Sequence, residues 1–255
     1  MDEMKRILSY TRRAVDDYEM IHEGDKIAVG ISAGKDSLTL LYALAGLRRF
    51  YPKKFELVAI TVDMGFEGMD FTPIRELCER LDVPYIVAKT EISHIIFDVR
   101  KEKNPCSLCA KMRRGALYGF ARDIGCNKVA LGHHFDDVVE TFMLNLFYEG
   151  RLGCFQPVTF LSNTGITLIR PMIYMPEKDV RYFASRTELP VVKSTCPADG
   201  NTEREEMKKL LMSLEKENKG LRYRIFGAIQ RGGIDGYREF GKMQGIKAYE
   251  DDGEE

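Results

Sequence analysis

Short apolar runs alternate with longer amphipathic segments along the first 150 residues of this chain. The apolar runs are rich in β-branched residues and predict buried strands at 26–31, 56–63, 84–89 and 128–132. The amphipathic segments carry apolar residues at helical spacing and predict helices at about 36–50, 71–81, 108–124 and 136–148. Strands that alternate with helices form a parallel sheet covered on both faces. The pattern therefore predicts an α/β fold.

The flanking segments follow other patterns. We expect an N-terminal helix at 1–22, the α/β domain at 23–200, a helical extension at 201–242 and a disordered acidic tail at 243–255. Inside the domain, a hairpin and a further helix are predicted at 158–161, 166–169 and 176–188. The extension predicts a highly charged helix at 202–219 and a second one at 223–229.

Composition narrows the classes of function. The chain has 38 basic and 39 acidic residues, so any nucleic acid must be bound by a local basic patch and not by overall charge. We find no signal peptide, and the longest uncharged apolar run, 38–47, is shorter than the roughly 20 residues that span a bilayer. We expect a cytoplasmic protein with no membrane contact, in which clustered cysteines bind metal or do chemistry.

The first candidate site is the turn between the first predicted strand and helix, Ser32-Ala33-Gly34-Lys35-Asp36-Ser37. Small residues at a helix start leave backbone N–H groups free to bind phosphate, with the helix dipole behind them. The two serine hydroxyls and Lys35 add donors and charge, and Gly30, near the end of the predicted strand, is also expected to bind the nucleotide. The turn is not a kinase-type phosphate loop, because Val29 stands where that motif has its first glycine. An ordinary strand-to-helix turn is the alternative for these six residues alone.

The second candidate site is Cys106-Ser-Leu-Cys109, just before a basic helical segment. Two thiolates at this spacing can share a metal, and nearby cations favour the thiolate form. Further ligands are needed; Cys196 is the better candidate, and His133 and His134 are alternatives. Three thiolates without a fourth suit an iron–sulfur cluster with one open iron. A redox dithiol is another interpretation, although a thioredoxin-like context is missing.

The third candidate site is Gly132-His133-His134-Phe-Asp136-Asp137. A capping role is favoured for Asp136, whereas Asp137 is placed to hold Mg²⁺ or orient a nucleotide. His133 is either a proton carrier or a structural, hydrogen-bonded residue. Asp63 also ends a predicted strand, and the carboxyl ends of parallel strands meet at one edge.

Together these three stretches resemble the tRNA 2-thiocytidine biosynthesis (TtcA) family, within the TtcA/TtuA group of PP-loop ATP pyrophosphatases. The similarity runs from about residue 24 to residue 204. It implies a parallel five-stranded sheet sandwiched by helices, with a small C-terminal helical extension. It also implies a tRNA sulfurtransferase that uses ATP and Mg²⁺ to adenylate the base C2 oxygen, and a [4Fe-4S] cluster that carries the sulfur. A homodimer, and either a cysteine desulfurase or free sulfide as sulfur donor, are further expectations.

The resemblance assigns roles by position. It implies Cys106, Cys109 and Cys196 as cluster ligands, residues 32–37 as the phosphate loop, and Gly132 and Asp137 near the nucleotide. Arg113 falls at a basic position that faces the ATP and the reacting base, and Lys35 and Arg113 would offset charge on the phosphoryl oxygens. The basic residues that are candidates for binding tRNA phosphates are Lys111, Arg113, Arg114, Arg48, Arg49, Lys53 and Lys54.

Three features depart from the family or leave alternatives open. Asp199 stands where the family often has a second thiol after Cys196. The zinc fingers of the uridine-specific group are missing, which favours the cytidine group but leaves open a substrate outside tRNA. Ala33 stands at a usual glycine position and is strained if its φ is positive. An adenylating enzyme with a structural zinc, and a nucleotide-binding regulator without turnover, remain the competing interpretations.

Overall fold

The computed structural model describes residues 3–100, 105–192, 196 and 203–240. The predicted acidic tail and Asp199 lie outside these residues. No helix in the described ranges is both long and apolar enough to cross a membrane.

The centre of the fold is one mixed sheet. Its strands are β1 (Asp25–Gly30), β2 (Phe55–Asp63), β3 (Tyr85–Lys89), β4 (Lys128–Ala130), β5 (Val158–Leu161) and β6 (Ile166–Ile169). They lie in the order β3-β2-β1-β4-β6-β5, and every neighbouring pair is parallel except β5 and β6. The predicted α/β class is confirmed, but the described sheet has six strands and not five. The predicted hairpin accounts for the difference, since β6 pairs in parallel with β4 and β5 adds an antiparallel edge.

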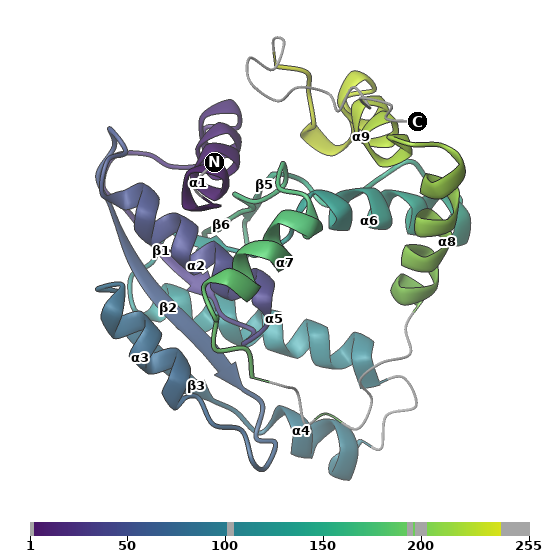
Figure 1. The fold of residues 1–255 in the computed structure, drawn as a ribbon. Coiled ribbons are helices and arrows are strands. Elements are labelled where there is room, and N and C mark those ends of the chain that lie inside the picture. Colours follow the sequence, from purple (N-terminus) through teal and green to yellow (C-terminus); the bar gives the residue numbers. More distant parts are fainter. Residues whose placement is uncertain (1–2, 101–104, 193–195, 197–202, 241–255) are drawn as a thin grey trace.

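The helices cover the sheet unequally. Their bounds are α1 (Glu3–Asp17), α2 (Lys35–Arg48), α3 (Thr72–Arg80), α4 (Ile92–His94), α5 (Pro105–Asp123), α6 (Phe135–Tyr148), α7 (Glu177–Arg186), α8 (Glu203–Glu217) and α9 (Leu221–Arg231). Alternate residues of a strand face opposite sides of the sheet. On one side, Ile27 and Val29 of β1 pack in the larger core with α1, α2, α3, α6 and α7. On the other side, Ala28 packs in a smaller core with α5. Figure 1 shows α8 and α9 as an arm beside α6. A π-helix, Ile95–Val99, and a 3₁₀ turn, Ile234–Gly236, complete the helices.

The strand order reverses direction between β1 and β4. From β1 the chain proceeds outward through β2 and β3. It then returns to β4 on the other side of β1, and beyond β4 it forms first the edge strand β5 and then β6, which lies between β4 and β5. Ligands of open α/β sheets bind beyond the carboxyl ends of the strands at such a reversal. The loops after β1 and β4 carry the first and third candidate sites, so the fold brings these two sites together.

Helix α5 begins earlier than the sequence pattern predicts. It starts at Pro105, so Cys106 lies in its first turn and Cys109 begins the second. Proline is favoured at the first helical position, a signal that the analysis of periodicity overlooked. Residues three apart lie on the same side of a helix, which brings the two thiols to one side of α5.

Candidate functional site

A cavity of about 390 Å³ opens at the carboxyl ends of β1, β2 and β4. Its polar lining includes residues from the first and third candidate sites and Arg113 and Arg114 of α5, but none of the cysteines that the structure describes. From the predicted site, the cavity is lined by Gly30, Ser32, Asp36, Ser37, Asp63, Arg113, Gly132 and Asp137. An apolar wall is formed by Met64, Phe66, Met69 and Phe71, which follow β2. The cavity therefore offers phosphate-binding donors at one side and a surface suited to a flat ring at the other.

The phosphate loop is held by its own side chains. The Ser32 N–H donates to Ser37 Oγ over 3.1 Å, and the Ser37 hydroxyl donates to the carbonyl of Gly34 over 3.0 Å. Ala33 is buried and has a φ of 66°, the left-handed conformation that the sequence analysis identified as a strain for alanine. The loop is thus preformed around one unfavourable backbone conformation.

Gly132 lets two candidate stretches meet. A Cβ added there would lie 3.0 Å from the carbonyl carbon and oxygen of Asp36 and 3.1 Å from the Ser37 nitrogen. These are backbone atoms at the start of α2 and cannot turn aside as a side chain would. The end of β4 therefore contacts the phosphate loop only because residue 132 has no side chain.

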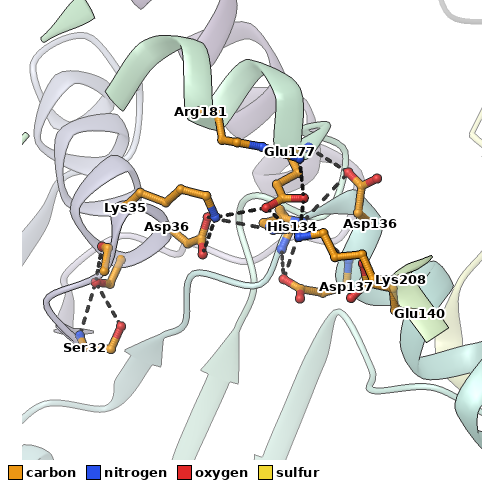
Figure 2. A network of polar contacts seen from close by, with 12 residues as sticks. Ser32, Lys35, Asp36, His134, Asp136, Asp137, Glu140, Glu177, Arg181 and Lys208 are labelled. Atoms are coloured by element: carbon orange, nitrogen blue, oxygen red, sulfur yellow. Dashed lines mark hydrogen bonds and ion pairs between the residues drawn. The ribbon is translucent and has the colours of Figure 1, made fainter. Parts of the chain in front are cut away.

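The side chain of Lys35 points away from the cavity, in which it was expected to offset the negative charge of bound phosphate. Its Nζ lies 2.8 Å from Asp36 Oδ1 and 3.2 Å from Glu177 Oε1, and Lys35 does not line the cavity. Figure 2 shows its side chain extending toward Glu177, away from Ser32. Burial opposes the charged form, but the two carboxylates outweigh it and raise the pKa of Lys35. In this arrangement Lys35 ties the loop to α7.

Glu177 is the centre of the polar network in Figure 2, and the sequence analysis missed it. It is buried at the start of α7, where Lys208 Nζ lies 2.9 Å and Arg181 Nη2 3.0 Å from its Oε2. Burial favours the neutral acid, but the hydrogen bond from Lys208 and the charge of Lys35 prevail and lower the pKa of Glu177 to about 2. One carboxylate thus joins the phosphate loop, α7 and α8.

The two adjacent aspartates differ in role. Asp137 forms a capping box with His134: its Oδ2 accepts from the His134 N–H over 2.9 Å, and its own N–H donates to His134 Nδ1 over 3.4 Å. Asp136 was expected to cap its own helix. Instead its Oδ2 accepts from the Glu177 N–H over 2.6 Å at the start of α7, and its other oxygen pairs with Arg222 of α9.

Arg204 is a second residue that the sequence analysis missed. From the first turn of α8, its Nη1 lies 3.2 Å from Asp137 Oδ1 and 3.5 Å from Glu140 Oε2, and its Nη2 donates to Thr141 Oγ1 over 3.0 Å. Glu140 is buried, and burial together with the charge of Asp137 raises its pKa to about 7. The helix at 202–219 was predicted only as a charged segment. In the sequence, the signal for these contacts was a pair of cations one helical turn apart, Arg204 and Lys208.

The three predicted cysteine ligands lie within electrostatic reach of one another. Cys109 Sγ lies 3.5 Å from Met64 Sδ in the cavity wall. Burial raises the pKa of the Cys109 thiol, Arg113 works against it, and the thiols of Cys196 and Cys106 raise it further. Among the residues that the structure describes, no three His, Cys, Asp or Glu side chains form a group able to hold a metal ion. Cysteines around a four-iron cluster bind different irons, so three thiols that influence one another, one of them in contact with Met64 of the cavity wall, are a suitable donor set for it.

His133 has the surroundings of a structural residue. Its ring stacks on Phe155 with centroids 4.7 Å apart, and its Nδ1 accepts from Arg170 Nε over 3.3 Å. Burial and the charge of Arg170 lower the pKa of His133 to about 4. Of the two roles considered for it, the geometry favours the hydrogen-bonded one.

Comparisons with known proteins agree in family and fold. A family model described as a PP-loop domain matches residues 7–215. The tRNA-cytidine(32) 2-sulfurtransferase of Geobacter sulfurreducens is 42% identical over 228 residues, which cover 88% of this chain and 89% of that protein. That of Teredinibacter turnerae is 40% identical over 229 residues, covering 89% and 76%. Among solved structures, the U34-tRNA thiolase NcsA from Methanococcus maripaludis with its [4Fe-4S] cluster matches with a TM-score of 0.76 and 28% identity, over 90% of this chain and 78% of that one.

Proposed function

Because the chain belongs to the PP-loop family, and within it to the tRNA-cytidine(32) 2-sulfurtransferases, we propose that it replaces the C2 oxygen of cytidine 32 in tRNA by sulfur, at the expense of ATP. The observation that carries this proposal is the cavity itself. It joins the phosphate loop, Arg113 and Asp137 to a wall whose Met64 contacts Cys109. Activation by a nucleotide and delivery of sulfur then take place on one bound base.

The first step is adenylation of the base. The loop amides and the hydroxyls of Ser32 and Ser37 bind the phosphates of ATP, and Arg113 offsets charge that develops on the α-phosphoryl oxygens. The C2 oxygen attacks the α-phosphorus, a C2–O–P bond forms, and the bond to the β-phosphate breaks with release of pyrophosphate. Asp137 and Asp63 line this edge of the cavity and would hold Mg²⁺ there.

The second step exchanges oxygen for sulfur. A sulfur nucleophile forms a bond to C2, and AMP leaves with the former base oxygen. Cys106, Cys109 and Cys196 are the proposed ligands of a [4Fe-4S] cluster, which supplies an open iron as the carrier of that sulfur when it is bound. The apolar wall of Met64, Phe66 and Met69 shields the activated carbon from water, which would otherwise return the base to cytidine.

The partners are proposed on charge. Arg113 and Arg114 are exposed on α5 beside the cavity, where they can bind tRNA phosphates on either side of the inserted base. A homodimer, and a cysteine desulfurase or free sulfide as the sulfur donor, remain predictions from the resemblance.

A reconstituted reaction tests the proposal. Protein loaded with iron and sulfide under anaerobic conditions is incubated with ATP, Mg²⁺, sulfide and tRNA that lacks 2-thiocytidine, and AMP and modified nucleosides are measured. We expect AMP to form only with tRNA and 2-thiocytidine to appear in step with it. Cys109→Ser should abolish thiolation. Cys126→Ala, at a buried cysteine that follows α5 and packs in the smaller core, should retain it. Absence of tRNA-dependent AMP would overturn the proposal, and colourless protein with one zinc per chain would favour the structural-zinc alternative.

A further inference from the structure

We infer that His133 binds a phosphoryl oxygen of the nucleotide in the cavity, through a hydrogen bond that its Nε2–H donates. Arg170, at the other nitrogen of the ring, is the positioning residue that keeps the proton on Nε2. The inference rests on the proposed function in one respect, since it takes the cavity as the site of the nucleotide. It gives His133 a task beyond the structural contacts of its Nδ1.

The hydrogen bond between Arg170 and His133 determines where the imidazole proton lies. Arg170 Nε donates to His133 Nδ1 over 3.3 Å, and a guanidinium group can only donate. Nδ1 is therefore unprotonated, and the ring carries its one proton on Nε2. Burial and the charge of Arg170 lower the pKa of His133 to about 4, which agrees with a neutral ring at pH 7. His133 can thus donate from Nε2 but cannot take up a proton without losing the bond to Arg170.

The second ring nitrogen of His133 is open to the cavity. No described residue forms a hydrogen bond with Nε2, and Nε2 is not one of the unpartnered polar atoms that are fully buried. The residue lines the cavity, and one face of its ring stacks on Phe155. A ring that is held at one face and at Nδ1 keeps a single orientation, so its remaining donor is preorganised for a ligand in the cavity.

The place of His133 in the sheet favours phosphate as the acceptor. Along the order β2-β1-β4, the apolar wall follows β2, the phosphate loop follows β1 and His133 follows β4. His133 therefore lies on the far side of the loop from the wall. Gly132, the residue before it, packs against the backbone of Asp36 and Ser37 in the loop. A nucleotide whose ring lies on the wall and whose phosphates lie on the loop presents phosphate to His133.

The charge of Arg170 is the second observation that indicates an anion. Arg170 is 7% exposed, and it forms no ion pair with a carboxylate of the described residues. Its other contacts are the carbonyl of Gln156, the hydroxyl of Thr159 at 3.2 Å and the ring of Phe155. A buried charge without a counter-charge is costly. The phosphates supply this counter-charge across the ring of His133, and Arg170 in turn polarises the Nε2–H into a stronger donor.

The test measures how tightly the full chain binds a non-hydrolysable ATP analogue. His133→Asn keeps an oxygen near the place of Nδ1, which can accept from Arg170, but has no N–H that reaches the place of Nε2. We expect the dissociation constant to rise about tenfold or more, as for the loss of a hydrogen bond to a charged group. His133→Gln, whose amide reaches further, should restore part of the affinity. His94→Asn, at an exposed histidine that does not line the cavity, is the matched control and should change nothing.

Adenosine and tRNA identify the acceptor. Adenosine has no phosphate, so its affinity should be the same in His133→Asn and the native protein, and so should the affinity for tRNA. An equal loss for adenosine and the analogue, or a loss confined to tRNA, would overturn the phosphate contact. Unchanged affinity of His133→Asn for the analogue would also overturn it, while leaving the proposed thiolation intact. A native protein that binds no nucleotide at all would overturn both.

NMR of protein with isotope-labelled histidine observes the tautomer directly. Long-range proton–nitrogen correlations should show an unprotonated Nδ1 and a protonated Nε2 for His133, and the Nε2–H signal should move when the analogue is added. Arg170→Met removes the donor and the charge, so both tautomers should appear and the affinity for the analogue should fall although His133 is intact. A proton on Nδ1 in the native protein would overturn the inference. Thermal unfolding of each variant shows whether a lost affinity reflects a lost fold.

Discussion

Glu177 provides the sharpest test of the polar network, through the substitution Glu177→Gln. Glutamine keeps the shape of the side chain but removes the charge that compensates Lys35, Lys208 and Arg181. The carboxyl is buried, and its pKa falls from 4.5 in a free side chain to about 2 in the fold. A difference of about 2.5 pKa units corresponds to ~3 kcal/mol of stability at neutral pH. The two lysines keep part of their hydration, so we expect a loss of about 2–3 kcal/mol.

The pH dependence distinguishes this charge effect from a packing defect. The folded-state pKa of Glu177 is depressed, so its contribution is complete above pH 4.5 and is lost as pH falls toward about 2. The free energy of unfolding is measured by urea titration of iron-free protein between pH 7 and pH 3. The difference between native protein and Glu177→Gln should be constant from pH 7 to about 5 and then shrink by ~1.4 kcal/mol per pH unit.

A control on the neighbouring helix α8 completes the design. Glu205 is exposed on α8, and Glu205→Gln should change stability by less than ~0.5 kcal/mol at every pH. A difference for Glu177→Gln that stays the same from pH 7 to pH 3 would mean that the carboxylate is not the source of the stabilisation. The reasoning about the network would then be wrong.

Three further substitutions test the loop and its neighbours. Gly132→Ala should weaken binding of the ATP analogue and cost about 1–3 kcal/mol of stability in urea titration, because its Cβ meets backbone, whereas Gly115→Ala in the open part of α5 should not destabilise. Ala33→Gly should change stability by less than ~1 kcal/mol, because the backbone strain of a positive φ is relieved while a buried methyl group is lost. Ala43→Gly inside α2 also removes a buried methyl group but relieves no strain, so it should cost about 2 kcal/mol. Glu140→Gln should stabilise the protein by about 1–3 kcal/mol at pH 8 but little at pH 5. Because the pKa of Glu140 is raised to about 7 in the fold, the stability of the native protein falls as pH rises from 4.5 to 7, and glutamine removes that fall. A change in stability that is the same at both pH values would contradict the raised pKa.

Much of the fold could be predicted because it depends on local patterns. The strands are short β-branched runs, and the phosphate loop combines a strand end, small residues and a helix start, all of which are visible within about twenty residues. The position of the site followed from one further rule, that parallel strands end at the same edge. Gly132 was expected near the nucleotide, but only the structure explains it, through the Asp36 backbone that lies against it.

The parts that were missed depend on contacts between distant segments. Periodicity cannot tell whether a hairpin strand joins the main sheet, so the pairing of β6 with β4 and the sixth strand were not predicted. Glu177 and Arg204 are ordinary charged residues in the sequence, and their importance arises only when α7 and α8 meet the loop and α6. Lys35 is the opposite case. The motif predicted that Lys35 binds phosphate, whereas in the structure it pairs with the carboxylates of Asp36 and Glu177.

The central claim is that one cavity activates a tRNA cytidine and delivers sulfur to it through three cysteines. The most direct measurement is mass spectrometry of tRNA nucleosides from cells that lack this protein, complemented with the native gene, with Cys196→Ser or with Cys154→Ser. We predict that 2-thiocytidine is missing without the protein, returns with the native chain and with Cys154→Ser, and does not return with Cys196→Ser. Undiminished 2-thiocytidine in the deleted cells, or full recovery with Cys196→Ser, would contradict the account.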